Sequence, residues 1–212
     1  RYCFRRSFPY ARETASRGDW RPALMRLARS GKTKEIILSG GDPLSLSNHR
    51  LSDLLRRIAA LPHIETVRIH TRFPIMIPER VDDGLVELLT KNRFNVAIVV
   101  HANHAREIDS SVVAALSRLR APATALLNQS VLLHQVNDDS DTLCALSERL
   151  FECGVLPYYL HLLDPVSGTA HFEVDEGVGI ELVKKMRANL PGYLVPTLVR
   201  EIPGESSKRP IQ

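Results

Sequence analysis

Cys3 is the residue near the start of the sequence whose surroundings favour chemistry. It lies within Arg1-Tyr2-Cys3-Phe4-Arg5-Arg6, where three arginines flank the thiol. Nearby positive charge favours the thiolate, the form of cysteine that binds metal. The other two cysteines, Cys144 and Cys153, lie far along the chain in or near a leucine-rich helical segment, as core or near-core thiols do. Cys3 is therefore a candidate metal ligand without a partner cysteine nearby in the sequence.

A second candidate is the loop that begins at Ser39. Three β-favouring apolar residues, Ile36-Ile37-Leu38, predict a strand buried on both faces, and the run ends at Ser39-Gly40-Gly41-Asp42-Pro43. Two glycines at the end of a strand let bare backbone approach a ligand closely, while Asp-Pro makes the chain turn. An ordinary turn after a buried strand is the alternative.

The same layout recurs along the chain, since each predicted strand runs out into polar side chains. These are Ser39 and Asp42; His70 and Arg72; His101, Asn103 and His104; Asn128 and Gln129; His161 and Asp164; Arg200 and Glu201. In a β/α barrel, the carboxyl ends of the strands and the loops after them form the active-site face. The recurring pattern predicts such a face here.

The elements that position these residues are strands alternating with helices. After the strand before Ser39, further buried strands are expected at Thr66–His70, Asn95–Val100, Thr124–Asn128, Leu156–His161 and Tyr193–Val199. Between them, apolar residues recur at helical intervals, as in Leu51, Leu54, Leu55 and Ile58. Strand and helix alternate about every thirty residues, which predicts a parallel sheet.

We expect a single α/β domain over residues 1–212, with the fold of a partial β/α barrel like the TIM barrel. An open doubly wound sheet is the alternative, but the G-x-G-x-x-G fingerprint is absent and polar groups end every strand. A complete barrel has about 250 residues, whereas this chain has 212 and begins at Arg1 within an apparent motif. The sequence is therefore expected to be a fragment whose amino-terminal part is absent.

Composition narrows the class of protein. A hydrophobic content of 44% suits a globular core, and nothing in the sequence resembles a signal peptide or a membrane span. Three cysteines make no disulfide framework, so a reducing cytoplasm is expected. The net positive charge of +4 is concentrated between Arg1 and Lys34, a segment that contains ten basic residues and two acidic ones. Such a segment is typical of a surface that binds nucleic acid, an acidic protein or an anionic ligand, and equally of a basic surface that only contacts solvent.

Four histidines at predicted strand ends raise the alternative of a zinc hydrolase. These are His70, His101, His104 and His161. The sequence contains neither an H-x-H pair on one strand nor an H-E-x-x-H motif, and Asn103-His104 fits a helix start equally well. The spacing therefore argues against that class.

Taken together, the motifs resemble those of a known family. Arg1–Arg6 is similar to the end of the C-x-x-x-C-x-x-C loop of radical S-adenosylmethionine enzymes. In order, the remaining motifs resemble the lysine 2,3-aminomutase family of these enzymes, and most closely its shorter bacterial branch that makes β-lysine for elongation factor P. These remaining motifs are Ser39-Gly40-Gly41-Asp42, His70-Thr71-Arg72, His101-Ala102-Asn103-His104, Asn128-Gln129-Ser130-Val131-Leu132-Leu133 and Gly204-Glu205-Ser206-Ser207-Lys208.

The resemblance implies three cofactors. Cys3 would be the third cysteine ligand of a [4Fe–4S] cluster, with the first two expected just before Arg1. The Ser39-Gly40-Gly41-Asp42 loop would take the amino group of S-adenosylmethionine through backbone carbonyls. His101, Asn103, Asn128 and Gln129 would line the pocket of that cosubstrate, although buried polar groups at strand ends often serve structure alone. Lys208 would be catalytic, forming the Schiff base with pyridoxal 5′-phosphate.

The resemblance also implies the substrate. Arg5 would pair with the α-carboxylate of L-lysine, for which a guanidinium fork is suited. Asp164 and Glu201 would receive its ε-ammonium, although larger members of the family carry Asp where this chain has Glu201. Two carboxylates suit an ammonium group, which has three donors and needs charge compensation once it is desolvated.

The expected function is thus an isomerase that converts L-lysine to β-lysine, serving the modification of elongation factor P together with its lysyl-ligase and an external electron donor. The first alternative is the same reaction in the catabolism of free lysine. A second, of another class, is a non-catalytic basic barrel that binds nucleic acid or a translation factor. We expect no membrane and no direct nucleic-acid binding, leave a homo-oligomer open, and expect this fragment alone to be inactive.

Overall fold

The computed structural model describes residues 20–202, 204–205 and 207–212. The chain divides into two compact units. We call described residues 20–100 and 114–126 the β1–β3 unit, and described residues from 101–113 and from 127 onward the β4–β7 unit. The prediction of one domain over residues 1–212 stays a prediction.

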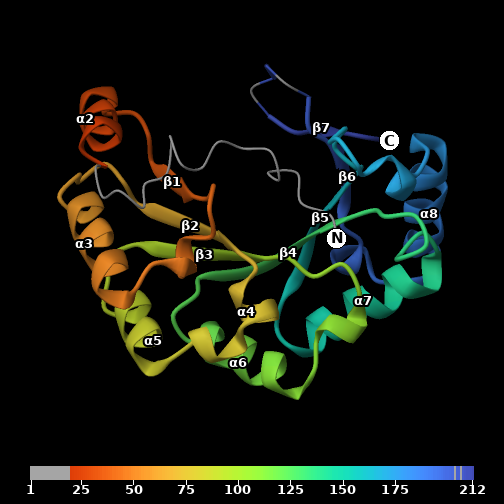
Figure 1. The fold of residues 1–212 in the computed structure, drawn as a ribbon, viewed down its shortest axis with the longest axis horizontal. Helices are drawn as coiled ribbons and strands as arrows, with labels where there is room; N and C mark the ends of the chain where they lie inside the picture. Colours follow the sequence, from red (N-terminus) through yellow and green to blue (C-terminus); the bar gives the residue numbers. More distant parts are fainter. Residues whose placement is uncertain (1–19, 203, 206) are drawn as a thin grey trace. The chain divides into compact units, whose positions relative to one another are not determined.

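The β1–β3 unit alternates parallel strands with helices. Its strands are β1 (Glu35–Leu38), β2 (Thr66–Thr71) and β3 (Asn95–Val100); β2 pairs in parallel with both β1 and β3. Its α-helices are α2 (Arg21–Ser30), α3 (Asn48–Ala59), α4 (Phe73–Met76), α5 (Asp83–Thr90) and most of α6 (Ser110–Arg120); two 3₁₀ turns are η2 (Pro43–Ser45) and η3 (Pro78–Arg80). Figure 1 shows α3 and α5 lying side by side.

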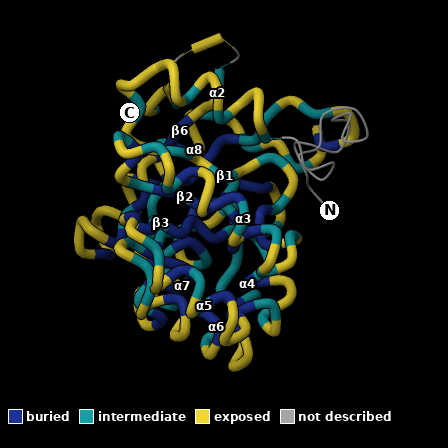
Figure 2. Tube along the Cα trace, turned by 90° about the vertical axis from the view of Figure 1, so that its left-hand side faces the viewer, coloured by how far each residue is buried: buried dark blue, intermediate teal, exposed yellow. Residues whose placement is uncertain are grey.

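Burial in β2 and α3 follows the expected periodicities, whereas the prediction that Ile36-Ile37-Leu38 is buried on both faces is wrong. Among the described strands β1 lies at the end of the sheet order, its residues are exposed or half-buried, and Ile37 is 49% exposed. Every other residue of β2 is buried, and α3 buries Leu51, Leu54, Leu55 and Ile58, the apolar series that the sequence predicts. In Figure 2, β2 and β3 run through dark-blue parts of the tube. Within α2, all of whose residues are described, no side chain is buried.

The β4–β7 unit continues the alternation. It holds β4 from residue 127 of Ala125–Val131, β5 (Leu156–His161), β6 (Thr197–Arg200) and β7 (Arg209–Pro210). Its helices are α7 (Ser140–Glu152) and α8 (Glu176–Asn189), with 3₁₀ turns η4 (Ala105–Glu107), η5 (Ala170–Phe172) and η6 (Gly192–Leu194). β4, β5 and β6 are parallel neighbours, and β7 pairs antiparallel with β6.

Most predicted strands are confirmed, and the last one differs. The sequence predicts a strand over Tyr193–Val199, but residues 193–194 lie in η6 and β6 runs over Thr197–Arg200. Pro196 stands directly before β6, and because proline has no N–H to donate to a ladder, it suits the position before the strand better than its interior. β7 was not predicted, since two residues carry no periodic signal.

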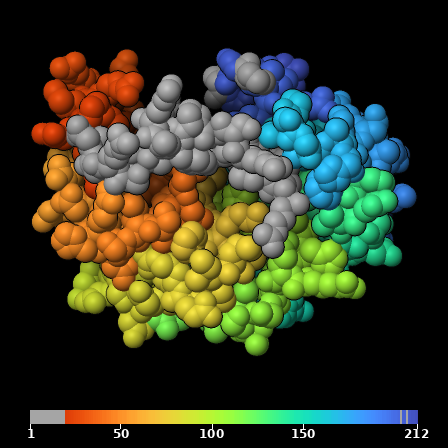
Figure 3. Space-filling view, viewed as in Figure 1, coloured from red at the N-terminus to blue at the C-terminus, as the bar shows by residue number. Residues whose placement is uncertain are grey.

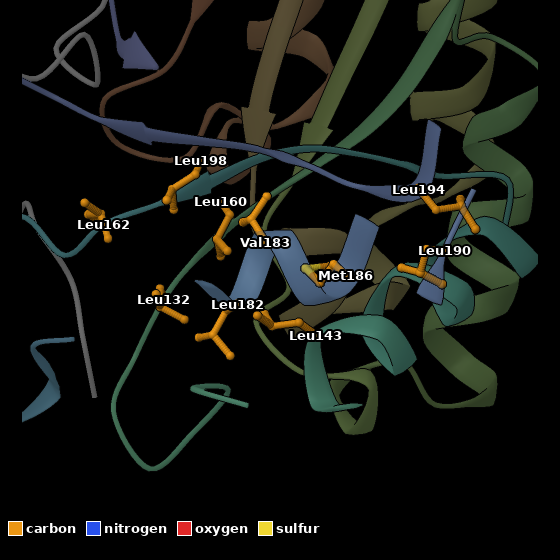
Figure 4. Close-up of a cluster of buried hydrophobic side chains, with 10 residues drawn as sticks. All are labelled: Leu132, Leu143, Leu160, Leu162, Leu182, Val183, Met186, Leu190, Leu194 and Leu198. Carbon is orange, nitrogen blue, oxygen red and sulfur yellow. The ribbon is translucent and has the colours of Figure 1, made fainter. Parts of the chain in front are cut away.

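The core of the β4–β7 unit lies between α8 and the strands. Figure 4 shows ten buried side chains converging there: Leu132, Leu143, Leu160, Leu162, Leu182, Val183, Met186, Leu190, Leu194 and Leu198. Gly179 lets α8 approach closely, because a Cβ at this position would lie 3.3 Å from the Cδ2 atoms of Leu132 and Leu162. This packing holds the ends of β5 and β6 in place; the predicted site residues Asp164 and Glu201 follow these strands, three residues after β5 and directly after β6.

Truncation of Met186 tests this core. Met186 is fully buried, so Met186→Ala should lower the free energy of unfolding by about 2–5 kcal/mol, through lost burial and the cavity left behind. Val178→Ala, at an exposed position of the same helix, should change it by less than about 0.5 kcal/mol. Urea titration of the full-length protein, followed by circular dichroism, gives both values; equal losses would contradict the described packing.

Candidate functional site

The predicted glycine loop follows β1 in the β1–β3 unit. Gly40 has φ 108°, a conformation that residues with a Cβ rarely adopt, so a glycine is required there. Ser39 and Gly41 are exposed and Gly40 is half-buried. Asp42 comes next and caps the turn η2, its side chain accepting a hydrogen bond from the backbone N–H of Leu44. The loop is therefore accessible and has a defined backbone.

Two predicted amides of the β4–β7 unit, Asn103 and Asn128, bind backbone groups. The Asn128 side chain, 1% exposed, accepts from Ala102 N at 2.8 Å through Oδ1 and donates to Ala102 O at 3.1 Å through Nδ2. The Asn103 Oδ1 accepts from Val131 N at 2.9 Å. Both amides thus join the segment that begins at His101 to β4. Their predicted place in the cosubstrate pocket stays a prediction.

A third amide, Asn137, belongs to this network and was missed by the sequence analysis. It is fully buried; its Oδ1 accepts from Leu133 N at 2.8 Å, and its Nδ2 donates to Asn103 O and Val131 O, both at 2.9 Å. The signal in the sequence is the run Asn137-Asp138-Asp139 after a strand, which is typical of a turn. That run gives no indication that the first residue points inward.

His101 and Gln129 form a pair in which the Gln129 amide keeps hydrogen-bonding capacity to spare. Their Nε2 atoms lie 2.6 Å apart, and Gln129 is 9% exposed. The Gln129 Oε1 is buried and has no hydrogen-bond partner among the described residues. Turning the amide exchanges its two polar atoms, so in either orientation one end pairs with His101 and the other is left to bind something else. A buried polar atom of this kind is suited to a ligand.

Lys208 and Glu201 meet at the end of β6. Arg200 pairs with Arg209 across the antiparallel β6–β7 ladder, and this register brings the preceding Lys208 opposite Glu201. The Lys208 Nζ lies 2.8 Å from the Glu201 Oε2, with 28% of the lysine side chain and 60% of the glutamate side chain exposed. Asp164, the other predicted carboxylate, lies just after β5 and is half-buried.

Two predicted ligands, Cys3 and Arg5, lie outside the described residues. Within the described part of the chain, no group of three or more His, Cys, Asp or Glu side chains is arranged to hold a metal ion.

Cys153 is buried and Cys144 half-buried, as the sequence predicts, and burial raises the pKa of both thiols. No helix of the described residues is long and apolar enough to cross a bilayer.

A groove of about 560 Å³ lies away from these residues, between α3 and α5 of the β1–β3 unit. Figure 3 shows the orange surface of α3 on the face in view. The groove is lined by the seam between the two helices, including Leu55, Glu87 and Leu88, and by Arg93, whose guanidinium donates to Ala59 O and Leu61 O near the end of α3. Helix seams do not carry the active site of this type of fold, so the strand ends remain the candidate site.

Comparison with curated sequences gives relatives along the whole chain. The L-lysine 2,3-aminomutase of Escherichia coli is 46% identical over 211 residues, covering 100% of this chain and 62% of that protein. The L-lysine 2,3-aminomutase of Haemophilus influenzae is 45% identical, covering 98% of this chain and 62% of that protein. The chain thus spans about 62% of the length of these two relatives. No protein-family model matches it.

Comparison with solved structures gives radical SAM enzymes. A radical SAM methyltransferase from Sphaerobacter thermophilus has a TM-score of 0.59 at 17% identity, covering 84% of this chain and 55% of its own. SuiB of Streptococcus suis, solved with S-adenosylmethionine bound, has a TM-score of 0.60 at 14% identity, covering 87% of this chain and 43% of its own. This likeness shows the fold alone, and it confirms the predicted partial β/α barrel.

Removal of the Asn137 amide tests the structural network. Asn137→Ala leaves one buried and two part-buried backbone groups without their partner, so the free energy of unfolding should fall by about 1–3 kcal/mol. Asn189→Ala, an exposed amide at the end of α8, should have an effect below about 0.5 kcal/mol. Urea titration of the full-length variants measures both, and an Asn137→Ala protein as stable as wild type would contradict the buried network.

Proposed function

Over its whole length the chain is homologous to the L-lysine 2,3-aminomutases, and on this premise we propose that it is the core of an enzyme that moves the amino group of L-lysine from C2 to C3. The product would be β-lysine. Because the chain spans about 62% of these relatives, this activity is proposed for the full-length protein that contains it. The observation that carries the proposal is the contact between Lys208 and Glu201.

This contact supports a lysine substrate. Glu201 is the carboxylate that the family resemblance assigns to the ε-ammonium of the substrate, and here it accepts a lysyl ammonium, that of Lys208, at 2.8 Å. The side-chain ammonium of Lys208 is the same chemical group as the tail of the proposed substrate. A carboxylate that receives one at hydrogen-bond distance has the chemistry to receive the other. We propose that Glu201 and Asp164 share the ε-ammonium of L-lysine.

Lys208 is proposed to hold pyridoxal 5′-phosphate through its side-chain amine. Two features suit it to this role. It is partly shielded from water, with 28% of its side chain exposed, and it lies at the carboxyl end of β6, on the active-site edge of a barrel strand. The cofactor would supply the electronic stabilisation that lets nitrogen migrate between carbons. The protein's part is to position the amine and, at Glu201, to compensate charge.

The Gly40–Gly41 loop is proposed to bind the amino group of S-adenosylmethionine through its backbone. The left-handed conformation of Gly40 supports this, because it exposes backbone where a side chain would otherwise intervene. The spare polar atom of Gln129, held by His101, is proposed to form a hydrogen bond to the same cosubstrate. Bound to a [4Fe–4S] cluster, S-adenosylmethionine would supply the radical that starts the reaction.

Cys3 is proposed as one ligand of that cluster, together with two cysteines expected upstream of Arg1. Arg5 is proposed to hold the α-carboxylate of the substrate, since its guanidinium matches a carboxylate with two parallel hydrogen bonds. An external electron donor would reduce the cluster. Neither residue lies within the described part of the chain, so sequence resemblance alone supports these two assignments.

A narrower proposal concerns the fate of the product. The order of the motifs is similar to that of the bacterial branch that supplies β-lysine for elongation factor P, so we propose that this protein serves that modification together with a lysyl-ligase. The alternative is the catabolism of free lysine. Deletion of the gene separates the two: loss of β-lysyl groups from elongation factor P would support the first, and loss of growth on lysine alone the second.

Replacement of Lys208 tests the assignment of pyridoxal phosphate. The full-length protein, reconstituted anaerobically with iron and sulfide, should convert L-lysine to β-lysine, and borohydride should fix pyridoxal phosphate on Lys208, as mapped by mass spectrometry. Lys208→Ala should reduce both signals to background, because the variant has no amine at this position. Lys185→Ala, which changes an exposed lysine of α8, should retain both. A wild-type protein without turnover would refute the proposal.

Neutralising Glu201 tests the substrate assignment. Glu201→Gln keeps the shape of the side chain and removes its charge, so the KM for L-lysine should rise by about 10- to 100-fold, corresponding to one lost charged hydrogen bond. Labelling of Lys208 by pyridoxal phosphate should persist. Glu205→Gln, in the same segment but paired with Arg209, is the matched control and should leave KM within about twofold. Steady-state kinetics would overturn the assignment if Glu201→Gln had the wild-type KM.

A further inference from the structure

The carboxylate of Asp42 links the glycine loop to the end of the neighbouring strand. Its Oδ1 accepts from Leu44 N at 3.0 Å and from the Thr71 hydroxyl at 2.7 Å. Its Oδ2 accepts from Arg72 N at 2.6 Å. Thr71 is the last residue of β2 and Arg72 the next one, while Asp42 lies four residues after the end of β1. One side chain therefore joins the loops after two adjacent parallel strands.

The partners of Asp42 are themselves held in place. Thr71 is 2% exposed, and its hydroxyl, which donates to Asp42, also accepts from Phe73 N at 3.1 Å. Phe73 is the first residue of α4, so the contact continues into the helix after β2. Hydrogen bonds to a charged carboxylate are stronger than those between neutral groups. The link is thus short, charged and anchored in a buried side chain.

Arg80 fixes the same turn through two further hydrogen bonds. Its Nε donates to Leu44 O at 2.7 Å and its Nη2 to Leu46 O at 2.9 Å. Leu44 is 2% exposed, so its side chain is anchored in the core as well. The chain is thereby fixed directly after the glycines, just as β1 fixes it before Ser39.

Gly40 and Gly41 have no side chain with which to fix their own position. Their backbone is placed by the paired strand β1 on one side and by the anchored residue Asp42 on the other. We propose that Asp42 is a positioning residue for S-adenosylmethionine: its carboxylate, through Thr71 and Arg72, sets where the Gly40–Gly41 carbonyls point. The side chain itself binds protein donors rather than the ligand. This inference depends on the proposed function, which assigns the loop to the cosubstrate.

The geometry explains why this position needs a carboxylate. All three groups that face Asp42 are hydrogen-bond donors. An asparagine would present its NH₂ group to at least one of them, which puts two donors face to face. A glutamate would move the carboxylate away by one methylene group. Only aspartate satisfies all three donors from this backbone position.

The test measures binding of S-adenosylmethionine to the full-length, cluster-loaded protein by anaerobic isothermal titration calorimetry. Asp42→Asn should weaken binding by about 10- to 100-fold, the range expected for one lost charged hydrogen bond, while the KM for L-lysine stays within about twofold. Thr71→Val should also weaken binding of S-adenosylmethionine, whereas Thr71→Ser, which keeps the hydroxyl, should bind it as the wild type does. Comparing the affinities of the Thr71→Val and Thr71→Ser proteins tests the inference even if Asp42→Asn does not fold.

Asp139→Asn is the matched control, because Asp139 also caps a helix, α7, by accepting from Thr142 N at 2.8 Å. It should lower stability without changing the affinity for S-adenosylmethionine. Equal affinity in the wild type, Asp42→Asn and Thr71→Val proteins would overturn the inference and leave the proposed function standing. A wild-type protein that does not bind S-adenosylmethionine would instead refute the proposed function.

Discussion

The carboxyl end of a parallel strand leaves backbone N–H and C=O groups without ladder partners, and buried groups of this kind must find others. In both units of this protein, polar side chains at the strand ends meet that need. Asp42 receives the N–H of Arg72 just past β2, and Asn128 pairs with both backbone groups of Ala102. These hydrogen bonds fix the loops after the strands, and the candidate site is built on those loops.

This requirement divides the polar residues of the strand ends into two kinds. Asn103, Asn128 and Asn137 use their described hydrogen bonds on backbone and thereby serve the fold. Gln129 is buried beside His101 and keeps one polar atom without a described partner, so it retains capacity for a ligand. Residue type alone does not separate the two kinds. The separation comes from which backbone groups happen to lie within reach.

The contact between Lys208 and Glu201 lies at the end of β6. The pair Lys208–Glu201 shows a carboxylate receiving a lysyl ammonium at the strand end where the family resemblance assigns both a cofactor lysine and a substrate lysine. Under the proposed function, a cofactor bound to Lys208 would remove this partner from Glu201, and the substrate would bring the same group to replace it. The ion pair is half-exposed and therefore adds little to stability, which is consistent with a role in function rather than in folding.

The sequence by itself determined the alternation of strands and helices, the apolar faces such as that of α3, and the ordered motifs whose relatives cover the whole chain. These are local patterns, because the periodicity of burial is set by the geometry of each element. Tertiary structure alone decided that Asp42 reaches Thr71, 29 positions away, that Asn137 closes a network with Asn103, 34 positions away, and that β7 pairs with β6. Such contacts depend on where separate strands end relative to one another, and no local pattern encodes that register.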